Sequence, residues 1–497
     1  MAFSAPRTYL FICRLTRFAL VEMAMTSAAS NATAKKRKTT HRSAQVLFAL
    51  LLICVVPNMS LGYSVLTHEA IIDSMWVHDI TPVLLKRFPG ATADELREAH
   101  AYAYGGAIIQ DMGYYPFGSK FYSDLTHYVR SGDFVEALLR DAQDIKEYAF
   151  AVGALSHYWA DNGGHPIATN VSVPILYPKL KRQFGNNVTY EQSPSAHIQT
   201  EFGFDVLQIA QGHFASQDYH DFIGFSVAKP LLERAFKETY GIGLGSLFTN
   251  LDLALGTYRH TVSSLIPTMT RVAWETAKRE LAKKGVAQAS TVTADSVKAQ
   301  SPKAGASMTR DKFLYNLSRS AYSKEWGDQY QKPSFWDRVL AFLFRIMPKI
   351  GPFRTLNAMP STPATELLFM RGFDSTTVAY RRSLVQLAAN NLQLEDRDLD
   401  TGKPTRAGEY ARANSTFDHL LHSIAGNKFG DVTPELRANI LAFYRDTTMR
   451  TGTKKDSVAW SQTLRDLNGL RAADSTAHPP GGAADSAAHA AGDAIRK

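Results

Sequence analysis

Eight histidine and carboxylate side chains between positions 68 and 201 have the types and the spacing that a metal site requires. In chain order they are His68, Asp111, His127, His157, Asp161, His165, His197 and Glu201. Two pairs, His157 with Asp161 and His197 with Glu201, lie four residues apart, and a helix places such pairs on one face, about 6 Å apart at Cβ. Zinc takes imidazole and carboxylate ligands where no thiolate is available. The series therefore predicts a metal site built from nitrogen and oxygen donors.

Each fragment of the series also has a simpler interpretation. A histidine with an acid four residues later is common on solvated helices, and His68 or His127 alone is also what a capping or core histidine looks like. The surroundings of His157 favour a metal site, because the string AVGALSHYWAD sets this histidine and Asp161 among apolar residues. Buried polar groups without partners are costly, and a cluster of cations would satisfy them.

The element that carries His157 is predicted to be a helix. Apolar residues recur every three or four positions over 145–155, as the buried face of a helix requires. We expect Asp141 and Asp144 to lie early in this helix, where the helix dipole favours acids. Residues 162–164 (Asn-Gly-Gly) are expected to end it.

Composition divides the chain into segments. We expect a leader with a secretory signal at 1–62, a helical domain at 63–280, a flexible linker or insertion at 281–311, a helical extension at 312–470 and a disordered tail at 471–497. A second helix is expected over about 197–211. No run of alternating β-branched residues is long enough to favour a sheet, so the sequence predicts an all-α body.

The positive charge of the chain is concentrated at its start. The net charge is +9 over 497 residues, but residues 1–62 hold eight Lys or Arg and one acid, which leaves the rest at +2. A body so close to neutrality gives no electrostatic reason to expect a nucleic-acid binder.

The leader has the order of a secretory signal. Thirteen uncharged residues, 44–56, follow basic residues and precede the small segment 60–62. They are too few for a membrane span, which needs about twenty. We expect cleavage before Tyr63 and export to the periplasm or the extracellular space, with membrane association if the leader is kept. Cys13 and Cys54 both lie in the leader, so the mature chain has no disulfide partner and no thiolate ligand.

The ordered series resembles the trinuclear-zinc family of bacterial phospholipases C, whose framework related zinc-dependent single-strand nucleases share. The strings that carry the resemblance are YSVLTHEAII at 63–72, IIQDMGYYPFGSKFYSDLTHYVRSGDF at 108–134, SHYWADNGGHP at 156–166 and HIQTEFGFD at 197–205. They extend over about 63–210, a little under a third of the chain. The resemblance implies a compact multi-helix zinc phospholipase C-like bundle, here with additional C-terminal helices.

The resemblance also implies three Zn²⁺ ions and a role for each residue of the series. One zinc would be held by Asp111, His127, His157 and Asp161, a second by His165, His197 and Glu201, and a third by His68, a bridging oxygen of Asp161 and the backbone amino and carbonyl groups of Tyr63. Asp111 resembles the family residue that contacts zinc and orients or deprotonates the attacking water. It is therefore the candidate general base for phosphodiester hydrolysis by zinc-activated water.

The sequence departs from the family pattern at two places. Position 63 is Tyr where the family usually has Trp, but the backbone ligands do not depend on the side chain, and the amino ligand supports cleavage between Gly62 and Tyr63. The gap from Asp161 to His165 is four residues where relatives have five or six, and Gly163 and Gly164 are expected to allow the tighter return.

Three functions remain open at this point. The first is a phospholipase C acting on phospholipid headgroup esters, the second a zinc nuclease on the same framework, and the third a degenerate binding protein whose working part is 230–450. The low charge outside the leader argues against the nuclease, and the complete ligand set argues against the third.

Two further features bear on the substrate. Segment 334–353 combines apolar and basic residues as a membrane-surface helix does, although a core helix ending at Pro348 has the same composition. Four aromatic residues follow the candidate base, and they are suited to a headgroup pocket, to stacking on a nucleobase or to simple packing. They are Tyr114, Tyr115, Phe117 and Phe121.

Overall fold

The computed structural model describes residues 65–210, 225–267, 270, 361–445 and 454–477. The predicted leader with Tyr63, the segment 281–311 and the segment 334–353 lie outside these residues, so the predictions about them stay predictions. Among the described residues, no helix is long and apolar enough to cross a membrane.

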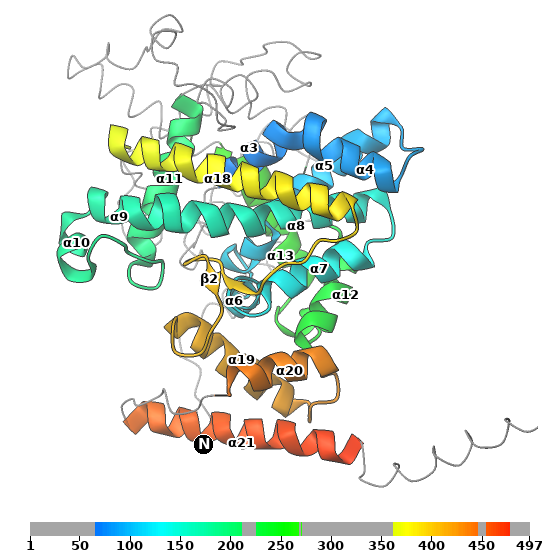
Figure 1. Cartoon of the computed structure of the whole chain (residues 1–497), viewed down its shortest axis with the longest axis vertical. Coiled ribbons are helices and arrows are strands. Elements are labelled where there is room, and N and C mark those ends of the chain that lie inside the picture. Colours follow the sequence, from blue (N-terminus) through cyan, green and yellow to red (C-terminus); the bar gives the residue numbers. More distant parts are fainter. Residues whose placement is uncertain (1–64, 211–224, 268–269, 271–360, 446–453, 478–497) are drawn as a thin grey trace, which may run out of the picture. The chain divides into compact units, whose positions relative to one another are not determined.

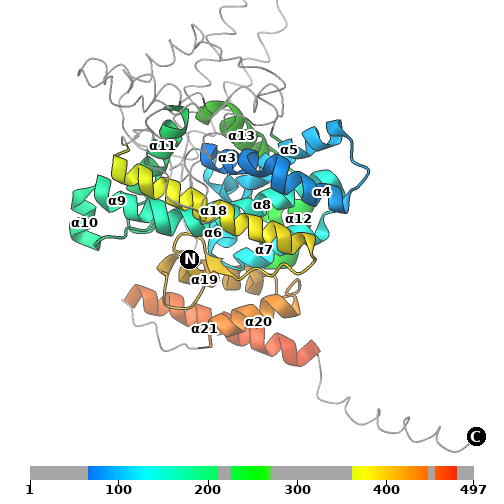
Figure 2. The ribbon, with the colours of Figure 1, turned by 45° about the horizontal axis from the view of Figure 1, so that its top comes forward.

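Helices make up almost all of the described structure (Figures 1 and 2). Up to residue 265 they are α3 (Val65–Met75), η2 (Trp76–Ile80), α4 (Thr81–Arg87), α5 (Ala93–Ala107), η3 (Ile109–Tyr114), α6 (Lys120–Tyr128), α7 (Ser131–Asp141), α8 (Ile145–Gly164), η4 (His165–Thr169), α9 (Asn170–Leu176), α10 (Pro178–Phe184), α11 (Pro194–Ala210), α12 (Lys229–Tyr240), η6 (Leu244–Ser246), α13 (Leu251–His260) and η7 (Thr261–Leu265). After residue 360 they are α18 (Pro363–Ala388), α19 (Ala411–Gly426), α20 (Pro434–Phe443) and α21 (Lys454–Ala477). Two short antiparallel strands, β1 (Arg397–Asp398) and β2 (Lys403–Pro404), complete the described part, so the predicted all-α fold is confirmed.

Helix α8 is the element around which the candidate site is built. Its N-cap is Asp144, whose carboxylate accepts hydrogen bonds from the backbone N–H groups of Lys146 and Glu147 at 2.9 and 2.8 Å. The predicted helix is therefore confirmed, but the placement of Asp141 was wrong, because this residue ends the preceding helix α7. Nearly every side chain of α8 is buried, so other helices must cover it on several sides.

Helix α5 crosses α8 at backbone contact. A Cβ atom at Gly153 would lie 2.1 Å from the carbonyl oxygen of Ala103, and one at Gly106 would lie 1.9 Å from that of Phe150. Only glycine fits at these two positions. The close crossing brings the C-terminal end of α5 next to His157 of α8.

Helix α18 covers α8 from another direction, and Figure 1 shows the two helices lying along each other. The hydroxyl of Tyr380 donates to the carbonyl of Val152 at 2.9 Å, and the indole N–H of Trp159 donates to the hydroxyl of Ser383 at 2.8 Å. The predicted helical extension thus packs directly on the predicted N-terminal domain.

Residues 395–402, which we name the strap, follow α18 after the connection 389–394 and cross several elements that carry site residues. Tyr158 donates its hydroxyl to the carbonyl of Glu395 at 2.6 Å, and the N–H of Leu399 donates to the carbonyl of His127 at 3.0 Å. The side-chain amide of Asn170 donates to the carbonyl of Asp400 at 2.7 Å. The strap is therefore tied to α6, α8 and α9.

The last three helices, α19, α20 and α21, pack against one another. Phe417 of α19 stacks on Phe443 of α20 with ring centroids 3.7 Å apart, and His422 lies 3.0 Å from Asp466 of α21. Helix α21 continues to Ala477, so the expected start of a disordered tail at 471 is corrected. The rest of that expected tail lies outside the described residues.

Candidate metal centre

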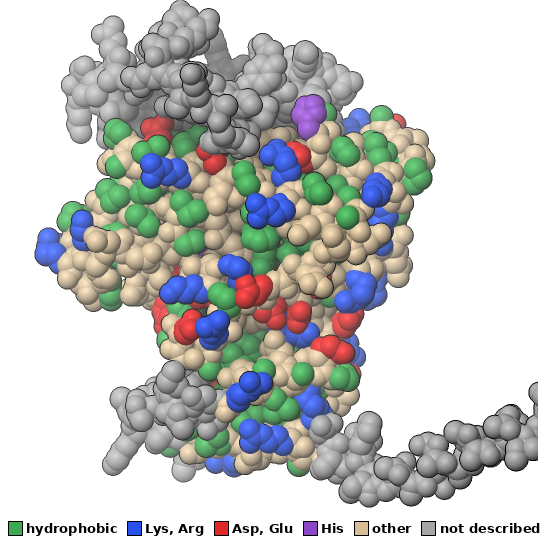
Figure 3. Space-filling model, in the orientation of Figure 1, with side chains coloured by type: hydrophobic (Ala, Val, Ile, Leu, Met, Phe, Trp, Pro, Cys, Tyr) green, Lys and Arg blue, Asp and Glu red, His purple; other side chains and the backbone are tan. Residues whose placement is uncertain are grey.

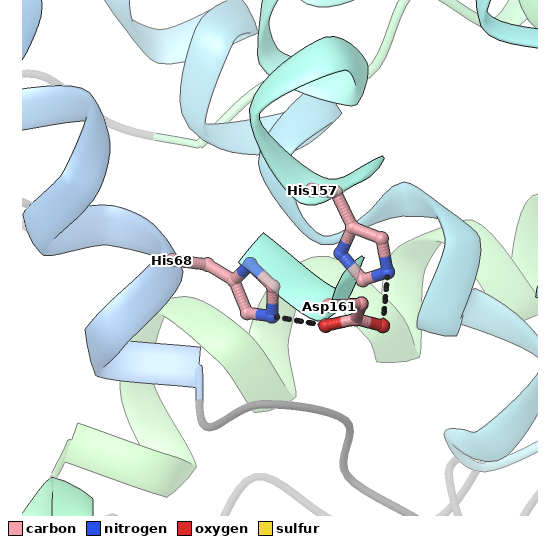
Figure 4. Close-up of side chains that lie close together, drawn as sticks. All are labelled: His68, His157 and Asp161. Atoms are coloured by element: carbon pink, nitrogen blue, oxygen red, sulfur yellow. Dashed lines mark ion pairs between the residues drawn. The ribbon is translucent and has the colours of Figure 1, made fainter. Parts of the chain in front are cut away.

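The carboxylate of Asp161 lies at the centre of the histidine series. Its Oδ2 is 3.2 Å from Nε2 of His157 and 3.4 Å from Nε2 of His127. Its Oδ1 is 3.6 Å from Nε2 of His68 and 3.7 Å from Nε2 of His165. Figure 4 shows His68 and His157 pointing at the two oxygens of this carboxylate from different helices. One carboxylate therefore faces four imidazoles, as a bridging ligand would.

The two other carboxylates of the series lie on either side of Asp161. Oδ1 of Asp111 is 3.2 Å from Nε2 of His127. Oε1 of Glu201 is 2.8 Å from Nε2 of His197 and 3.3 Å from Nε2 of His165. The eight residues predicted from the sequence thus converge, and each is at most 4% exposed.

Backbone carbonyl groups orient two of the imidazoles. Nδ1 of His157 lies 3.0 Å from the carbonyl of Ala107, at the end of α5, and Nδ1 of His127 lies 2.7 Å from the carbonyl of Ser123 on its own helix. A carbonyl accepts only, so each ring has a hydrogen on Nδ1, and in its neutral form each ring points an Nε2 lone pair into the cluster. This is the tautomer that a metal ligand needs.

The spacing from Asp161 to His165 is explained by helix continuation. Residues 163 and 164 are the last two of α8, and the chain passes directly into the π-helical turn η4, with Gly164 at φ −68° and ψ −49°. The expectation that the two glycines allow a tight return was therefore wrong. Because the helix continues, Asp161 and His165 project from one face, and His165 reaches Glu201.

Burial and neighbouring charge shift the pKa values of the cluster in opposite directions. Burial alone would raise the pKa of Asp161, but the charges of His157 and His165 hold it well below its ordinary value. Burial also opposes the charged form of His127, yet the carboxylates of Asp111 and Asp161 raise its pKa to about 10.

Two members of the cluster are shifted toward their neutral forms. Burial, with the neighbouring charge of His157, lowers the pKa of His68 to about 3, and burial raises the pKa of Glu201 to about 8 against the opposing effect of His165. Neutral imidazole is the form that binds a metal, and a bound cation would favour the ionised form of Glu201.

Three groups of donor atoms are compact enough to hold a metal ion. In each group the donor atoms lie within 4.8 Å of one another, and the groups are His68 with His157 and Asp161, Asp111 with His127 and His157, and His165 with His197 and Glu201. By hydrogen-bond geometry the buried oxygens of Asp161 and Glu201 accept no hydrogen bond from the part of the chain that the structure describes. Three buried carboxylates among five imidazoles fit divalent zinc, because zinc binds both donor types and its charge would offset theirs. That these residues hold zinc stays a prediction.

The structure adds residues that the sequence analysis missed. Asp400 of the strap lies 3.6 Å from Nδ1 of His165, and Asp205 accepts the backbone N–H of Leu66 at 3.1 Å. Asp205 lies one helical turn after Glu201 on α11, so that spacing was a usable signal. The sequence gives no comparable signal for Asp400, because this residue lies far along the chain in an aperiodic segment.

The four aromatic residues after the candidate base do not form one pocket. Tyr114 lies 6.0 Å from the ring of His127, whereas Tyr115 packs on Tyr258. Phe121 stacks on a histidine of α19 and Phe117 is 44% exposed. Among these ring contacts, that of Tyr114 with His127 is the one that reaches the cluster.

An all-α body with a buried, thiolate-free cluster of imidazoles and carboxylates defines the class of the protein as a helical protein with a candidate zinc centre. Residues 67–250 match the family model of zinc-dependent phospholipase C. The family resemblance inferred from the sequence is thereby confirmed for this part of the chain, which contains all eight converging side chains. No curated protein and no solved structure was found to match the chain.

Proposed function

We propose that this protein is an exported zinc-dependent phosphodiesterase that hydrolyses phospholipid headgroup esters in the manner of phospholipase C. The observation that carries the proposal is the convergence of eight buried donor side chains in one cluster, with four imidazoles around Asp161, within residues that match the zinc-dependent phospholipase C family. The family match supports the phospholipid as substrate.

We propose three ions, the number that the family resemblance implies, with His157 assigned to one of the two donor groups that share it. Asp111, His127, His157 and Asp161 would hold one, His165, His197 and Glu201 a second, and His68 with Asp161 a third, completed by the backbone of Tyr63 after cleavage. Zinc in such a site would supply positive charge for the phosphoryl oxygens and would lower the pKa of a bound water to about 7.

Asp111 is the residue that we propose as general base. It lies in the 3-10 turn η3, and hydrogen bonds hold that turn against α6: the N–H of Gly113 donates to Ser123 Oγ at 3.0 Å, and the same hydroxyl donates to the carbonyl of Gln110 at 2.6 Å. Oδ1 of Asp111 lies 3.2 Å from Nε2 of His127, so this carboxylate is placed beside a ligand of the proposed zinc, where a base that accepts a proton from the attacking water would have to lie.

The Asp111→Asn variant tests this role. Asparagine keeps an oxygen at Oδ1 but removes the base, so turnover should fall by about 10²–10⁴ while most zinc stays bound. A zinc-replete Asp111→Asn sample that hydrolyses lecithin at the wild-type rate would refute the base assignment.

Substrate class is tested with purified mature protein. Zinc content is measured by elemental analysis, and hydrolysis is assayed on lecithin and on single-stranded DNA. Zinc with lecithin turnover supports the proposal, DNA turnover supports the nuclease alternative, and a chain without metal supports a non-catalytic binding protein. On the face shown in Figure 3, Lys and Arg side chains are scattered among acidic ones, which gives no support to a nucleic-acid groove.

Export is part of the proposal and has its own test. The basic, apolar and small segments of residues 1–62 support secretion with cleavage before Tyr63. N-terminal sequencing of protein recovered outside the cytoplasm should begin at Tyr63. A mature chain that begins elsewhere would remove the backbone ligand proposed for the third zinc.

A further inference from the structure

We infer that Asp400, from the strap, is a positioning residue for His165, and that the C-terminal extension thereby contributes to the metal centre. The inference rests on the proposed function in one respect, since it takes His165, His197 and Glu201 as one metal-binding group. It adds a residue that lies outside the segment matching the family model.

The two ring nitrogens of His165 face different carboxylates, and Nε2 is the one that faces the cluster. Nε2 lies 3.3 Å from Oε1 of Glu201, and Nδ1 lies 3.6 Å from Oδ1 of Asp400. Asp400 is 1% exposed, so water screens this contact little. A carboxylate beside Nδ1 favours the tautomer with the hydrogen on that nitrogen, which leaves the Nε2 lone pair for a metal.

The carboxylate of Asp400 is itself held in place. Its Oδ2 accepts the backbone N–H of Tyr190 at 3.0 Å and the hydroxyl of Tyr410. Its backbone N–H donates to Oδ1 of Asp398 at 2.9 Å, which closes the turn between β1 and β2. With one oxygen and the backbone fixed in this way, Oδ1 keeps its direction toward His165.

The strap is also fitted closely to α8. Gly402 has φ +69°, and a Cβ atom there would lie 2.9 Å from the carbonyl oxygen of Asn162, so a side chain at this position would be both strained and crowded. Asn162 directly follows Asp161 on α8. The turn that carries Asp400 is therefore positioned by backbone contact with the helix that carries the bridging carboxylate.

The test compares Asp400→Asn with Asp398→Asn in the full chain. Both aspartates are buried in the same turn, and both changes are isosteric. Among the described residues the carboxylate of Asp398 bonds to Asp400 and Thr401 of the turn, and asparagine keeps the Oδ1 oxygen that accepts the backbone N–H of Asp400, so this support of Asp400 stays in place. Zinc affinity is measured by competition with a chromogenic chelator, and zinc per chain by elemental analysis. We expect Asp400→Asn to weaken one zinc by about 10–100-fold and leave the others unchanged. Asp398→Asn should keep wild-type affinities.

The Tyr410→Phe variant provides an intermediate case, because it keeps Asp400 but removes one hydrogen bond to Oδ2. It should weaken the same zinc by less than Asp400→Asn does. Thermal unfolding of the chelated proteins checks that each variant folds.

The outcomes separate the two proposals. A wild-type chain that binds no zinc would overturn both the metal centre and this inference. A wild-type chain that binds zinc, with Asp400→Asn binding every ion as tightly, would overturn the inference alone. Equal weakening by Asp400→Asn and Asp398→Asn would also overturn it, because the strap would then act through its fold and not through the carboxylate beside His165.

Discussion

Replacing Asp161 by asparagine perturbs the centre most directly, because this carboxylate lies between four imidazoles at 3.2 to 3.7 Å. Asparagine has nearly the same shape but carries no charge and has only one oxygen. It can serve one cation but cannot bridge two. If the proposed function holds, we therefore expect the Asp161→Asn variant to lose at least one of the three proposed zinc ions and to hydrolyse lecithin far more slowly than the wild type.

The Asp161→Asn variant should also be less stable than the wild type when both are metal-free. Asp161 is fully buried, and removing one partner from a buried charge pair costs about 3–5 kcal/mol. Because the native pKa of Asp161 is held well below its ordinary value, its contribution is complete above its unfolded pKa of about 4 and is lost as the pH falls. The native pKa of His127 is raised to about 10, so its contribution is complete below about 6.5 and is lost as the pH rises through about 10. The difference in unfolding free energy between the wild type and Asp161→Asn should thus be largest between about pH 4 and pH 6.5.

The assay is urea unfolding of the chelated proteins at pH 6 and pH 10, with zinc per chain measured before chelation. Asp374→Asn is a matched control with the opposite expectation. Burial raises the pKa of the half-buried Asp374 to about 6, so losing its charge should leave stability at pH 7 unchanged or increase it. An Asp161→Asn variant that keeps three zinc ions and unfolds at the wild-type urea concentration would refute the bridging role.

Two further predictions concern packing and proton release. Gly153→Ala should destabilise the chelated protein by about 1–3 kcal/mol in urea unfolding and should weaken zinc binding, because the added methyl group would meet a carbonyl of α5 and move His157. Gly256→Ala is the control, because a methyl group there points into open space on α13, and it should have neither effect. Zinc added to chelated protein in weak buffer at pH 7 should release protons, because His127, with its pKa raised to about 10, must lose its proton to bind metal. Zinc binding without a fall in pH would contradict the protonated state expected for His127 between Asp111 and Asp161.

The sequence predicts the eight converging side chains but not the residues that support them. Helix periodicity and the two i, i+4 pairs are local signals, and α8 and α11 place both pairs as expected. Asp400 carries no such signal, because its contact with His165 depends on how a distant turn folds against α9 and α8. The misplacement of Asp141 has a similar cause: the chain turns between α7 and α8, and local composition does not mark that break.

The burial pattern of α8 explains why the extension cannot be separate from the metal centre. The family match ends at residue 250, yet α8 is buried almost all round, and a helix of that kind needs cover on every side. Helix α5 covers one side at backbone contact, and α18, from beyond the family match, covers another through Tyr380 and Ser383. Because the strap follows α18 in the chain, the packing of α18 on α8 also helps to place the carboxylate of Asp400 beside His165.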